Sequence, residues 1–266
     1  MVEGIKNFLK DFFGKGEENY KFRYFSLEHI IPLVIMVIII ILIYRYRHII
    51  RENLELDKKL RTYLSFIVSF VNMSVYWLYI NIGVDLTTSL PISICQSIMI
   101  FSPFLLLNKS QKLFDIFYFW TLCGSINALI TPAILDNYGP TKYRYYQFWI
   151  GHTGIFIIIF YCIFVLQMEV NFKSLLTSIK WLLLFSVLAI FANYSIPGAN
   201  YLFLSGSEKG QSLLDLLPTY LPYRIAILFV LVVILFYIAY LPWYIKERNK
   251  NNHLLNNSHE KALLDK

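Results

Sequence analysis

Charged residues are scarce in this chain of 266 residues. They make up 15% of it, whereas an ordinary soluble domain carries about 25%. A soluble fold of this composition would need several fully buried helices with almost no polar face, and the composition excludes an ordinary soluble domain on that ground. The connections between the apolar segments are also too short for a second folded domain, so we expect a single membrane domain.

Cysteine is rare as well. Cys95, Cys123 and Cys162 all lie within apolar segments, whereas disulfide frameworks hold together the loops of small secreted domains. We therefore do not expect a disulfide framework. The chain contains no Cys-x-x-Cys or His-x-x-x-His spacing of the kind that binds zinc. We expect neither a metal site nor a cofactor.

The N-terminus lacks the continuous apolar core of a cleavable signal peptide. Instead Ile5, Phe8, Leu9, Phe12 and Phe13 recur at helical spacing, with lysines between them. A short helix lying in the membrane interface fits this pattern, and so does a loosely ordered terminus. We expect residues 1–26 to form an N-terminal interfacial segment.

Long apolar runs dominate the rest of the chain. A run of about 20 apolar residues, at about 1.5 Å per residue, crosses a hydrocarbon layer of about 30 Å. Inside lipid each run must be helical, because no water is present to satisfy the backbone. The sequence thus predicts an all-α polytopic membrane bundle of about seven transmembrane helices over residues 27–245, followed by a polar C-terminal tail over residues 246–266. The predicted spans are Leu27–Tyr44, Thr62–Ile82, Leu90–Leu107, Leu113–Leu135, Phe148–Gln167, Leu175–Phe191 and Pro222–Ile245.

The net charge of +7 does not indicate nucleic acid binding. The basic residues flank the spans, where they set orientation and meet anionic lipid headgroups, so the expected partner is the lipid bilayer. The densest basic cluster, Arg45–Arg61, lies in the predicted first loop. We expect that loop and the C-terminus to be cytoplasmic and the N-terminus to lie outside, in a multi-pass protein of the cell membrane.

Polar residues inside a membrane are costly, so their positions carry information. With seven spans, those found here all lie toward the membrane face of the N-terminus, whichever way the protein is inserted. This convergence predicts a cavity near one leaflet for a small ligand or a lipid headgroup. The seventh span is expected only to pack. The converging residues are Glu28, His29, Asn81, Cys95, Gln96, Cys123, Asn127, Thr131, His152, Asn193, Tyr194, Asn200 and Tyr201.

Most of these residues also have a purely structural interpretation. A lone membrane cysteine such as Cys123 or Cys162 is usually a small buried hydrophobe. Asn127 and Thr131 share a helical face and are equally suited to bonding across helices. His152 is harder to explain in this way, because an imidazole about one turn below the headgroups is unfavourable unless it is paired.

A cysteine and a histidine at matched depth on facing helices indicate nucleophilic acyl chemistry, in which the histidine takes the thiol proton and returns it to the leaving group. Nearby Asn or Tyr groups would stabilise the oxyanion. We therefore predict Cys95 and His152 as catalytic residues. The predicted substrate-binding residues are Glu28, His29, Asn127, Thr131, Asn200 and Tyr201.

Several short sequence words add specificity. In chain order they are Phe25-Ser26-Leu27-Glu28-His29, Leu90-Pro91-Ile92-Ser93-Ile94-Cys95, Leu129-Ile130-Thr131-Pro132, Gly151-His152-Thr153-Gly154 and Pro197-Gly198-Ala199-Asn200-Tyr201-Leu202-Phe203-Leu204. With these words the chain resembles the YwaF family of bacterial multispan membrane proteins from about Phe25 to Leu241. That family is similar to a eukaryotic family of cysteine-dependent phospholipid acyltransferases. The resemblance implies that Cys95 is the nucleophile and His152 its partner. A more distant similarity is to the androgen-induced family of membrane hydrolases, which use a threonine and a histidine on fatty-acid esters.

Three functions remain open from the residues. The leading hypothesis is an acyltransferase acting on phospholipid or lysophospholipid. A lipid-ester hydrolase with the same site shares the acyl-enzyme step. The third is a transporter or a lipid-binding protein without chemistry. Against transport, the intramembrane acidic residues Glu28 and Asp85 both lie near the end of a span, and the two halves of the chain show no repeated pattern of broken spans. The residues do not specify the lipid or the oligomeric state.

Overall fold

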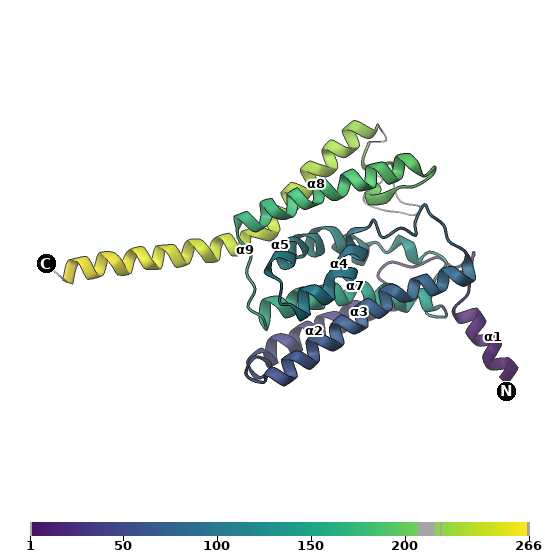
Figure 1. Ribbon diagram of the computed structural model, residues 1–266, viewed down its shortest axis with the longest axis horizontal. Coiled ribbons are helices and arrows are strands. Elements are labelled where there is room, and N and C mark those ends of the chain that lie inside the picture. The colour runs from purple at the N-terminus through teal and green to yellow at the C-terminus, as the bar shows by residue number, and fades with distance from the viewer. Residues whose placement is uncertain (1, 207–215, 219, 265–266) are drawn as a thin grey trace.

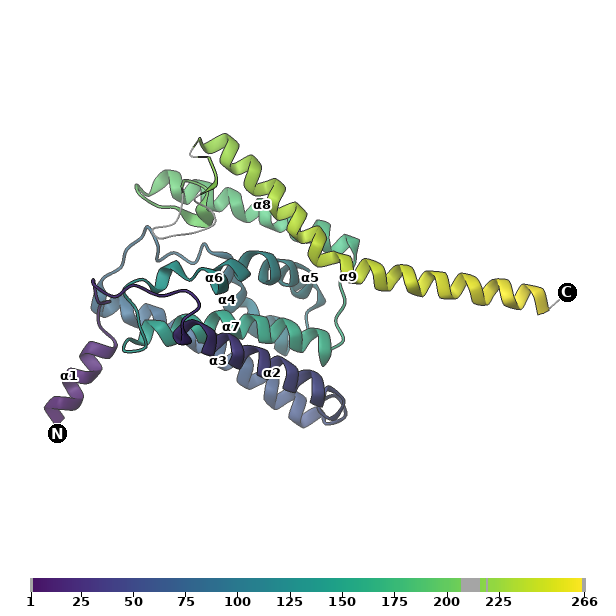
Figure 2. The ribbon, with the colours of Figure 1, turned by 180° about the vertical axis from the view of Figure 1, so that it is seen from behind.

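The computed structural model describes residues 2–206, 216–218 and 220–264, and every regular element in this part of the chain is helical. Helices α2 to α7 lie side by side, while α8 and α9 run along one side of them (Figure 1). Helix α1 and the end of α9 project at opposite ends of the molecule, as the reverse view also shows (Figure 2). The prediction of an all-α polytopic membrane bundle is confirmed.

Each predicted span corresponds to a helix or to a series of helices. Six helices in the described part of the chain are long and apolar enough to cross a membrane, and α4 is a shorter apolar helix. The fourth span is divided into α5, the π-helix η1 and α6. The bounds are α1 Val2–Phe12, α2 Leu27–Glu52, α3 Leu54–Ile82, α4 Ile94–Leu107, α5 Gln111–Phe119, η1 Trp120–Ser125, α6 Ile126–Ile130, η2 Ala133–Leu135, α7 Tyr143–Phe164, α8 Phe172–Ser195, η3 Tyr201–Phe203 and α9 Leu221–Leu264.

Lipid is the solvent for much of the surface. Only His29 and Ile50 of the 26 residues of α2 are buried, so its many isoleucine, leucine and valine side chains lie exposed. An exposed apolar face of this extent is not found on a soluble monomer. The multi-pass membrane assignment therefore rests on helix length and on surface composition together.

The basic cluster Arg45–Arg61 is helical and does not form the loop that the sequence predicted. Helix α2 continues to Glu52, and α3 begins at Leu54. The side chain of Asn53 between them accepts a hydrogen bond from Leu56 N at 2.9 Å, which caps α3. Charged residues are good helix formers, and beyond the hydrocarbon core nothing prevents the helices from continuing. For this reason the first two predicted spans are shorter than α2 and α3. The third and fourth predicted spans instead extend beyond the helices, because α4 begins only at Ile94 and α6 ends at Ile130.

The predicted polar tail is also helical. Helix α9 runs through residue 264, and its 44 residues correspond to a length of about 66 Å. This length exceeds the hydrocarbon thickness, so the end of α9 extends beyond the bundle (Figure 1).

Two prolines inside the spans show how freed backbone groups are satisfied. Pro32 in α2 has no N–H to donate to the Glu28 carbonyl, and the Tyr145 hydroxyl on α7 donates to that carbonyl instead. Pro103 in α4 likewise leaves the Met99 carbonyl free, and the Ser102 hydroxyl donates to it at 2.9 Å. The hydrogen bond from Tyr145 also links α2 to α7.

Two glycines on α7 allow its close packing against neighbouring helices. A Cβ atom on Gly151 would lie 2.8 Å from Met99 Cε on α4, and one on Gly154 would lie 2.6 Å from Val68 Cγ2 on α3. A larger residue at Gly154 would clash with the β-branched Val68, whereas at Gly151 the flexible end of Met99 would have to shift. Small residues at membrane helix interfaces commonly serve this purpose.

A buried charged cluster joins three helices at the end opposite the N-terminus. Asp57 and Arg61 on α3 form an ion pair at 3.0 Å, and the Tyr161 hydroxyl on α7 donates to Asp57 Oδ1 at 2.7 Å. Arg61 also donates to the Leu106 carbonyl at the end of α4, at 2.9 Å. Lys109 lies 3.4 Å from Asp57. The cluster ties α3, α4 and α7 together and satisfies one of the terminal carbonyls of α4.

The N-terminal segment is attached to the opposite end of the bundle. The nearly buried Lys142 donates to Asp11 Oδ1 at 2.6 Å, and Glu17 N donates to the Asn137 carbonyl at 2.8 Å. The Tyr20 hydroxyl donates to the Glu28 carboxylate. Burial and this hydrogen bond raise the pKa of Tyr20 above its ordinary value, so it stays protonated. Residues 2–12 form the helix that the first of the two interpretations predicts, whereas its position in the membrane interface stays a prediction.

Removing the charge of Asp57 tests the buried cluster. Asp57→Asn keeps the side-chain shape but leaves the Arg61 guanidinium buried without a counter-charge, so the free energy of unfolding should fall by about 3 kcal/mol. Urea unfolding in detergent micelles measures this loss. The control is Glu55→Gln, which breaks the exposed pair with Lys59 and should cost less than about 1 kcal/mol. Equal losses in the two variants would contradict the stabilising role of the cluster.

Candidate functional site

Cys95 lies in the first turn of α4. Ser93 is the N-cap of this helix, and its hydroxyl accepts a hydrogen bond from Gln96 N at 3.2 Å. The Cys95 thiol is partly buried and donates to Ser125 Oγ at 3.2 Å. The partial positive charge at a helix N-terminus favours a negatively charged group there, so this position suits a thiolate.

A π-helical turn supplies the partner of the thiol. The element η1 ends at Ser125, which is fully buried. Within η1, a Cβ atom on Gly124 would lie 3.1 Å from Ile94 Cδ1, so the glycine allows α4 to begin against this turn. A π-helical turn widens the backbone and is frequent at functional sites.

His152 lies in the third turn of α7, and its imidazole is partly exposed. Its Nδ1 lies 2.8 Å from the Phe148 carbonyl, an acceptor, so Nδ1 carries the proton of the neutral ring. Nε2 is then the unprotonated nitrogen, and no residue in the described part of the chain hydrogen-bonds to it. The ring also stacks on Phe148, with centroids 4.1 Å apart. The imidazole is held in place with a free lone pair.

The contact between Met99 and Gly151 relates the depths of the two groups. As the third and fifth spans, α4 and α7 run in the same direction, and Cys95 lies one turn before Met99 on the same face of α4. The His152 ring is directed back toward Phe148, one turn before its own backbone. Both groups therefore lie about one turn above the contact between the two helices. That Cys95 Sγ and His152 Nε2 lie close enough for proton transfer stays a prediction.

His29 joins three segments of the bundle. Its Nδ1 accepts a hydrogen bond from Phe25 N at 3.0 Å, so Nε2 carries the proton and donates to the Leu129 carbonyl on α6 at 2.7 Å. The ring is fully buried beside Trp149, with centroids 5.4 Å apart. Both nitrogens are engaged by backbone groups. Its neighbour Glu28 is held by Tyr20 and, through its carbonyl, by the hydroxyl on α7 described above.

Asn127 and Thr131 bond to each other at the end of α6. The Thr131 hydroxyl lies 3.3 Å from Asn127 Oδ1 and 3.1 Å from the Asn127 carbonyl. Both residues are partly exposed. Asn127 lies between Ser125, the partner of Cys95, and Leu129, the partner of His29, and Thr131 follows Leu129 by two residues. The side chain of Asn81, expected at the same face, lies outside the described residues.

Asn200 and Tyr201 shape the loop after α8. Asn200 Oδ1 accepts from Ser205 N at 2.9 Å and from Gly206 N at 3.1 Å. The Tyr201 hydroxyl donates to the Leu86 carbonyl and accepts from Leu90 N at 3.0 Å, which ties this loop to the segment before α4. Burial raises the pKa of Tyr201, so its hydroxyl stays protonated and maintains the bond to Leu86.

His29, Cys95 and Tyr201 thus lie toward one end of the bundle and are linked by a chain of contacts that does not include His152. The chain runs from His29 through α6 to Ser125 and Cys95, and then from the segment before α4 to Tyr201. Tyr194, also predicted to converge, is 90% exposed. Within the described part of the chain, no three His, Cys, Asp or Glu side chains cluster closely enough to hold a metal ion.

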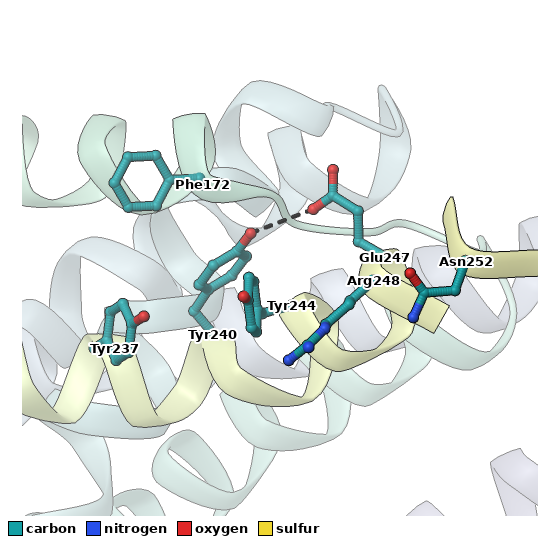
Figure 3. A pocket seen from close by; sticks show the side chains of 7 residues that line it. All are labelled: Phe172, Tyr237, Tyr240, Tyr244, Glu247, Arg248 and Asn252. Carbon is teal, nitrogen blue, oxygen red and sulfur yellow. Dashed lines mark hydrogen bonds between the residues drawn. The ribbon is translucent and has the colours of Figure 1, made fainter. Parts of the chain in front are cut away.

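A groove of about 570 Å³ lies at the opposite end, where α9 leaves the bundle (Figure 3). Tyr240 in this groove donates to Glu247 Oε2 at 3.3 Å. Tyrosines gathered beside charged residues at the end of a span are typical of the membrane interface. The groove is separate from Cys95 and His152. Its lining residues are Phe172, Tyr237, Tyr240, Tyr244, Glu247, Arg248 and Asn252.

Sequence reasoning missed several polar groups. Ser125 was not selected, although it lies only two residues after Cys123 in the same predicted span. Asn72 on α3 is buried, and its amide nitrogen has no hydrogen-bond partner in the described structure. Arg224, near the start of α9, is fully buried and donates to the Phe203 carbonyl at 2.9 Å, so the seventh span does more than pack. A polar residue inside an apolar run was the available signal for all three.

The Tyr201 hydroxyl provides a test of the loop arrangement. Tyr201→Phe leaves the Leu86 carbonyl and Leu90 N without a partner, so the free energy of unfolding should fall by about 1–3 kcal/mol. Urea unfolding in micelles measures it. Tyr194→Phe is the control, because Tyr194 is 90% exposed and should change stability by no more than about 0.5 kcal/mol. A Tyr201→Phe protein as stable as this control would contradict the tie between the loops.

Comparison with known proteins places the chain in a family. Neither the curated proteins nor the solved structures that were compared match it. The family model described as the TMEM164 family matches residues 24–240, which include every predicted site residue. The match confirms a family of membrane proteins, whereas the YwaF resemblance and the acyltransferase activity stay predictions. The chain belongs to the TMEM164 family.

Proposed function

We propose that this protein is an integral membrane acyltransferase that moves an acyl chain from a phospholipid to a lysophospholipid, with Cys95 as nucleophile and His152 as general base and acid. The observation that carries the proposal is the fixed tautomer of His152, whose Nδ1–H bond to the Phe148 carbonyl leaves Nε2 as a proton acceptor. The thiol of Cys95 at the start of the neighbouring helix is the nucleophile that this base serves.

In the first half of the reaction, Nε2 of His152 takes the thiol proton and Cys95 Sγ forms a bond to the ester carbonyl carbon of the donor phospholipid. The bond between that carbon and the glycerol oxygen then breaks. His152 returns the proton to the departing oxygen, so lysophospholipid leaves and a thioester remains on Cys95. The Ser125 hydroxyl, 3.2 Å from the sulfur, holds the thiol in place before attack.

In the second half, a hydroxyl of the acceptor lysophospholipid gives its proton to Nε2 and forms a bond to the thioester carbon. The carbon–sulfur bond breaks, and the proton returns to sulfur. Water as the acceptor gives hydrolysis by the same route, and the surrounding bilayer favours the lipid acceptor by excluding water.

We propose that Asn127, Thr131, Asn200 and Tyr201 line the path of the substrate, with Glu28 and His29 holding the surrounding segments. Support comes from their position at the same end of the bundle. With the basic ends of α2 and α3 in the cytoplasm, the site faces the outer leaflet of the cell membrane.

Cysteine variants test the nucleophile. Cys95→Ala should reduce the transfer of a labelled acyl chain between lipids in liposomes to background, because no other group forms the thioester. Cys95→Ser should retain little activity, since a hydroxyl is much harder to ionise than a thiol. The matched controls are Cys123→Ala and Cys162→Ala, which should transfer as fast as wild type. If Cys95→Ala protein also transferred at the wild-type rate, a non-catalytic lipid-binding or transport function would replace this proposal.

A histidine variant tests the base. His152→Ala should slow acyl transfer by about a hundredfold or more, the usual scale for a lost general base. Labelled free fatty acid measured in the same liposomes separates hydrolysis from transfer. The control is His48→Ala, at an exposed position on α2, which should leave the rate unchanged. Equal rates for the two variants would remove His152 from the mechanism.

A further inference from the structure

Arg144 combines partial burial with the lack of an ion pair in the described structure, whereas Arg23 at the same end of the bundle, also without an ion pair there, is exposed. Arg144 lies in the first turn of α7 and is partly buried. None of the ion pairs among the described residues includes it. By contrast, Lys142 two residues earlier lies 2.6 Å from Asp11 Oδ1, and Lys21 lies 3.8 Å from Asp136.

The guanidinium of Arg144 has unused hydrogen-bonding capacity. In the described structure it donates to Gln147 Oε1, and Gln147 in turn donates to the Val71 carbonyl on α3 at 3.3 Å. A guanidinium carries five N–H donors, so most of those of Arg144 remain available. A partly buried cation without a counter-charge at the end of a span is well suited to bind an anionic group at the membrane interface.

The side chain lies on the inner side of α7. Tyr146 and Ile150 are exposed and mark the lipid-facing side of this helix, whereas Phe148 is buried. At 100° per residue, Arg144, Phe148 and His152 follow one stripe roughly opposite that side. The charge of Arg144 lies close enough to interact electrostatically with the His152 imidazole. Arg144 therefore faces the same interior space as the proposed base.

Two phenols accompany the guanidinium. Tyr79 from α3 and Tyr138 from the segment before α7 both interact electrostatically with Arg144. Both are partly exposed, and neither hydroxyl has a hydrogen-bond partner among the described residues. A guanidinium with two O–H donors beside it suits a group with several anionic oxygens, because charge-assisted hydrogen bonds to phosphate are among the strongest that proteins form.

We propose that Arg144, with Tyr79 and Tyr138, binds the phosphodiester of the phospholipid substrate and thereby sets the depth of its ester groups. Arg144 lies at the end of its span, where lipid phosphates are found. His152 lies eight residues further along α7, about 12 Å deeper. The glycerol of a phospholipid carries its acyl esters on the hydrocarbon side of the phosphate. This inference rests on the proposed function, and it identifies the substrate class as a phosphate-bearing glycerolipid rather than a neutral one.

Binding to inactive protein tests this inference separately from catalysis. In the Cys95→Ala background in detergent micelles, a phosphatidylglycerol should raise the unfolding midpoint, whereas a diacylglycerol with the same chains should not. Arg144→Gln should weaken phospholipid binding by about tenfold to a hundredfold. Arg144→Lys should bind with intermediate affinity, because lysine keeps the positive charge but lacks the planar guanidinium that binds phosphate through two N–H groups. The control Arg23→Gln removes an exposed arginine from the same end of the bundle and should bind as tightly as its parent.

Three results of the binding measurements would overturn the inference. The first is equal stabilisation by phospholipid and diacylglycerol, and the second is equal affinity of Arg144→Gln and its parent for phospholipid. The third is full stabilisation by inorganic phosphate alone, which would indicate a soluble phosphate ligand. Without added lipid, Arg144→Gln should be at least as stable as its parent, because it removes an unpaired charge. A marked loss of stability in that variant would instead make Arg144 a structural residue.

In active protein, the same substitution has a distinct kinetic effect. Arg144→Gln should raise KM for a phospholipid donor by about tenfold or more, while acyl transfer from diacylglycerol should be unchanged. Equal losses with both donors would contradict phosphate binding. A wild-type protein without transfer activity would contradict the proposed function alone, since the binding measurements do not depend on it.

Discussion

No water reaches the hydrocarbon core of a bilayer, so each carbonyl, N–H and charge within the spans needs a partner from the protein. This constraint explains most of the connections between the helices. The carbonyl freed by Pro32 accepts from Tyr145, and the last carbonyl of α7, at Phe164, accepts from Arg51 Nε at 3.0 Å. Helix ends and helix breaks are thus the places where one span is joined to another.

The same constraint separates structural from functional polar groups. His29 has both ring nitrogens bonded to backbone groups, and Asn200 closes its own loop. His152 and Arg144 differ from them, because each keeps hydrogen-bonding capacity that no described residue uses. In a membrane such capacity is unfavourable unless a ligand completes it. The two residues lie on one stripe of α7, which is why the catalytic base and the phosphate-binding group are assigned to the same substrate.

The sequence predicted the fold class, because apolar runs and backbone satisfaction leave only helices. The alternating direction of successive spans also predicted that His29, Cys95 and Tyr201 lie toward the same end, where contacts link them. The span ends were less predictable, since Asn53 separates two helices that both continue through charged residues. The π-helical turn that ends at Ser125 packs against Ile94 through Gly124. Arg144 has no ion pair among the described residues because the nearby carboxylates of Asp11 and Asp136 pair with Lys142 and Lys21. Neither is visible in a single sequence, because each depends on contacts between distant segments.

The thioester on Cys95 is the species on which the proposed chemistry depends, and intact mass spectrometry detects it most directly. Wild-type protein in liposomes of one defined phospholipid, without an acceptor, should gain the mass of one acyl chain. Hydroxylamine should remove this mass, and the peptide containing Cys95 should carry it. Acyl transfer that proceeds while Cys95 stays unmodified, or an acyl group that persists in Cys95→Ala protein, would contradict the account.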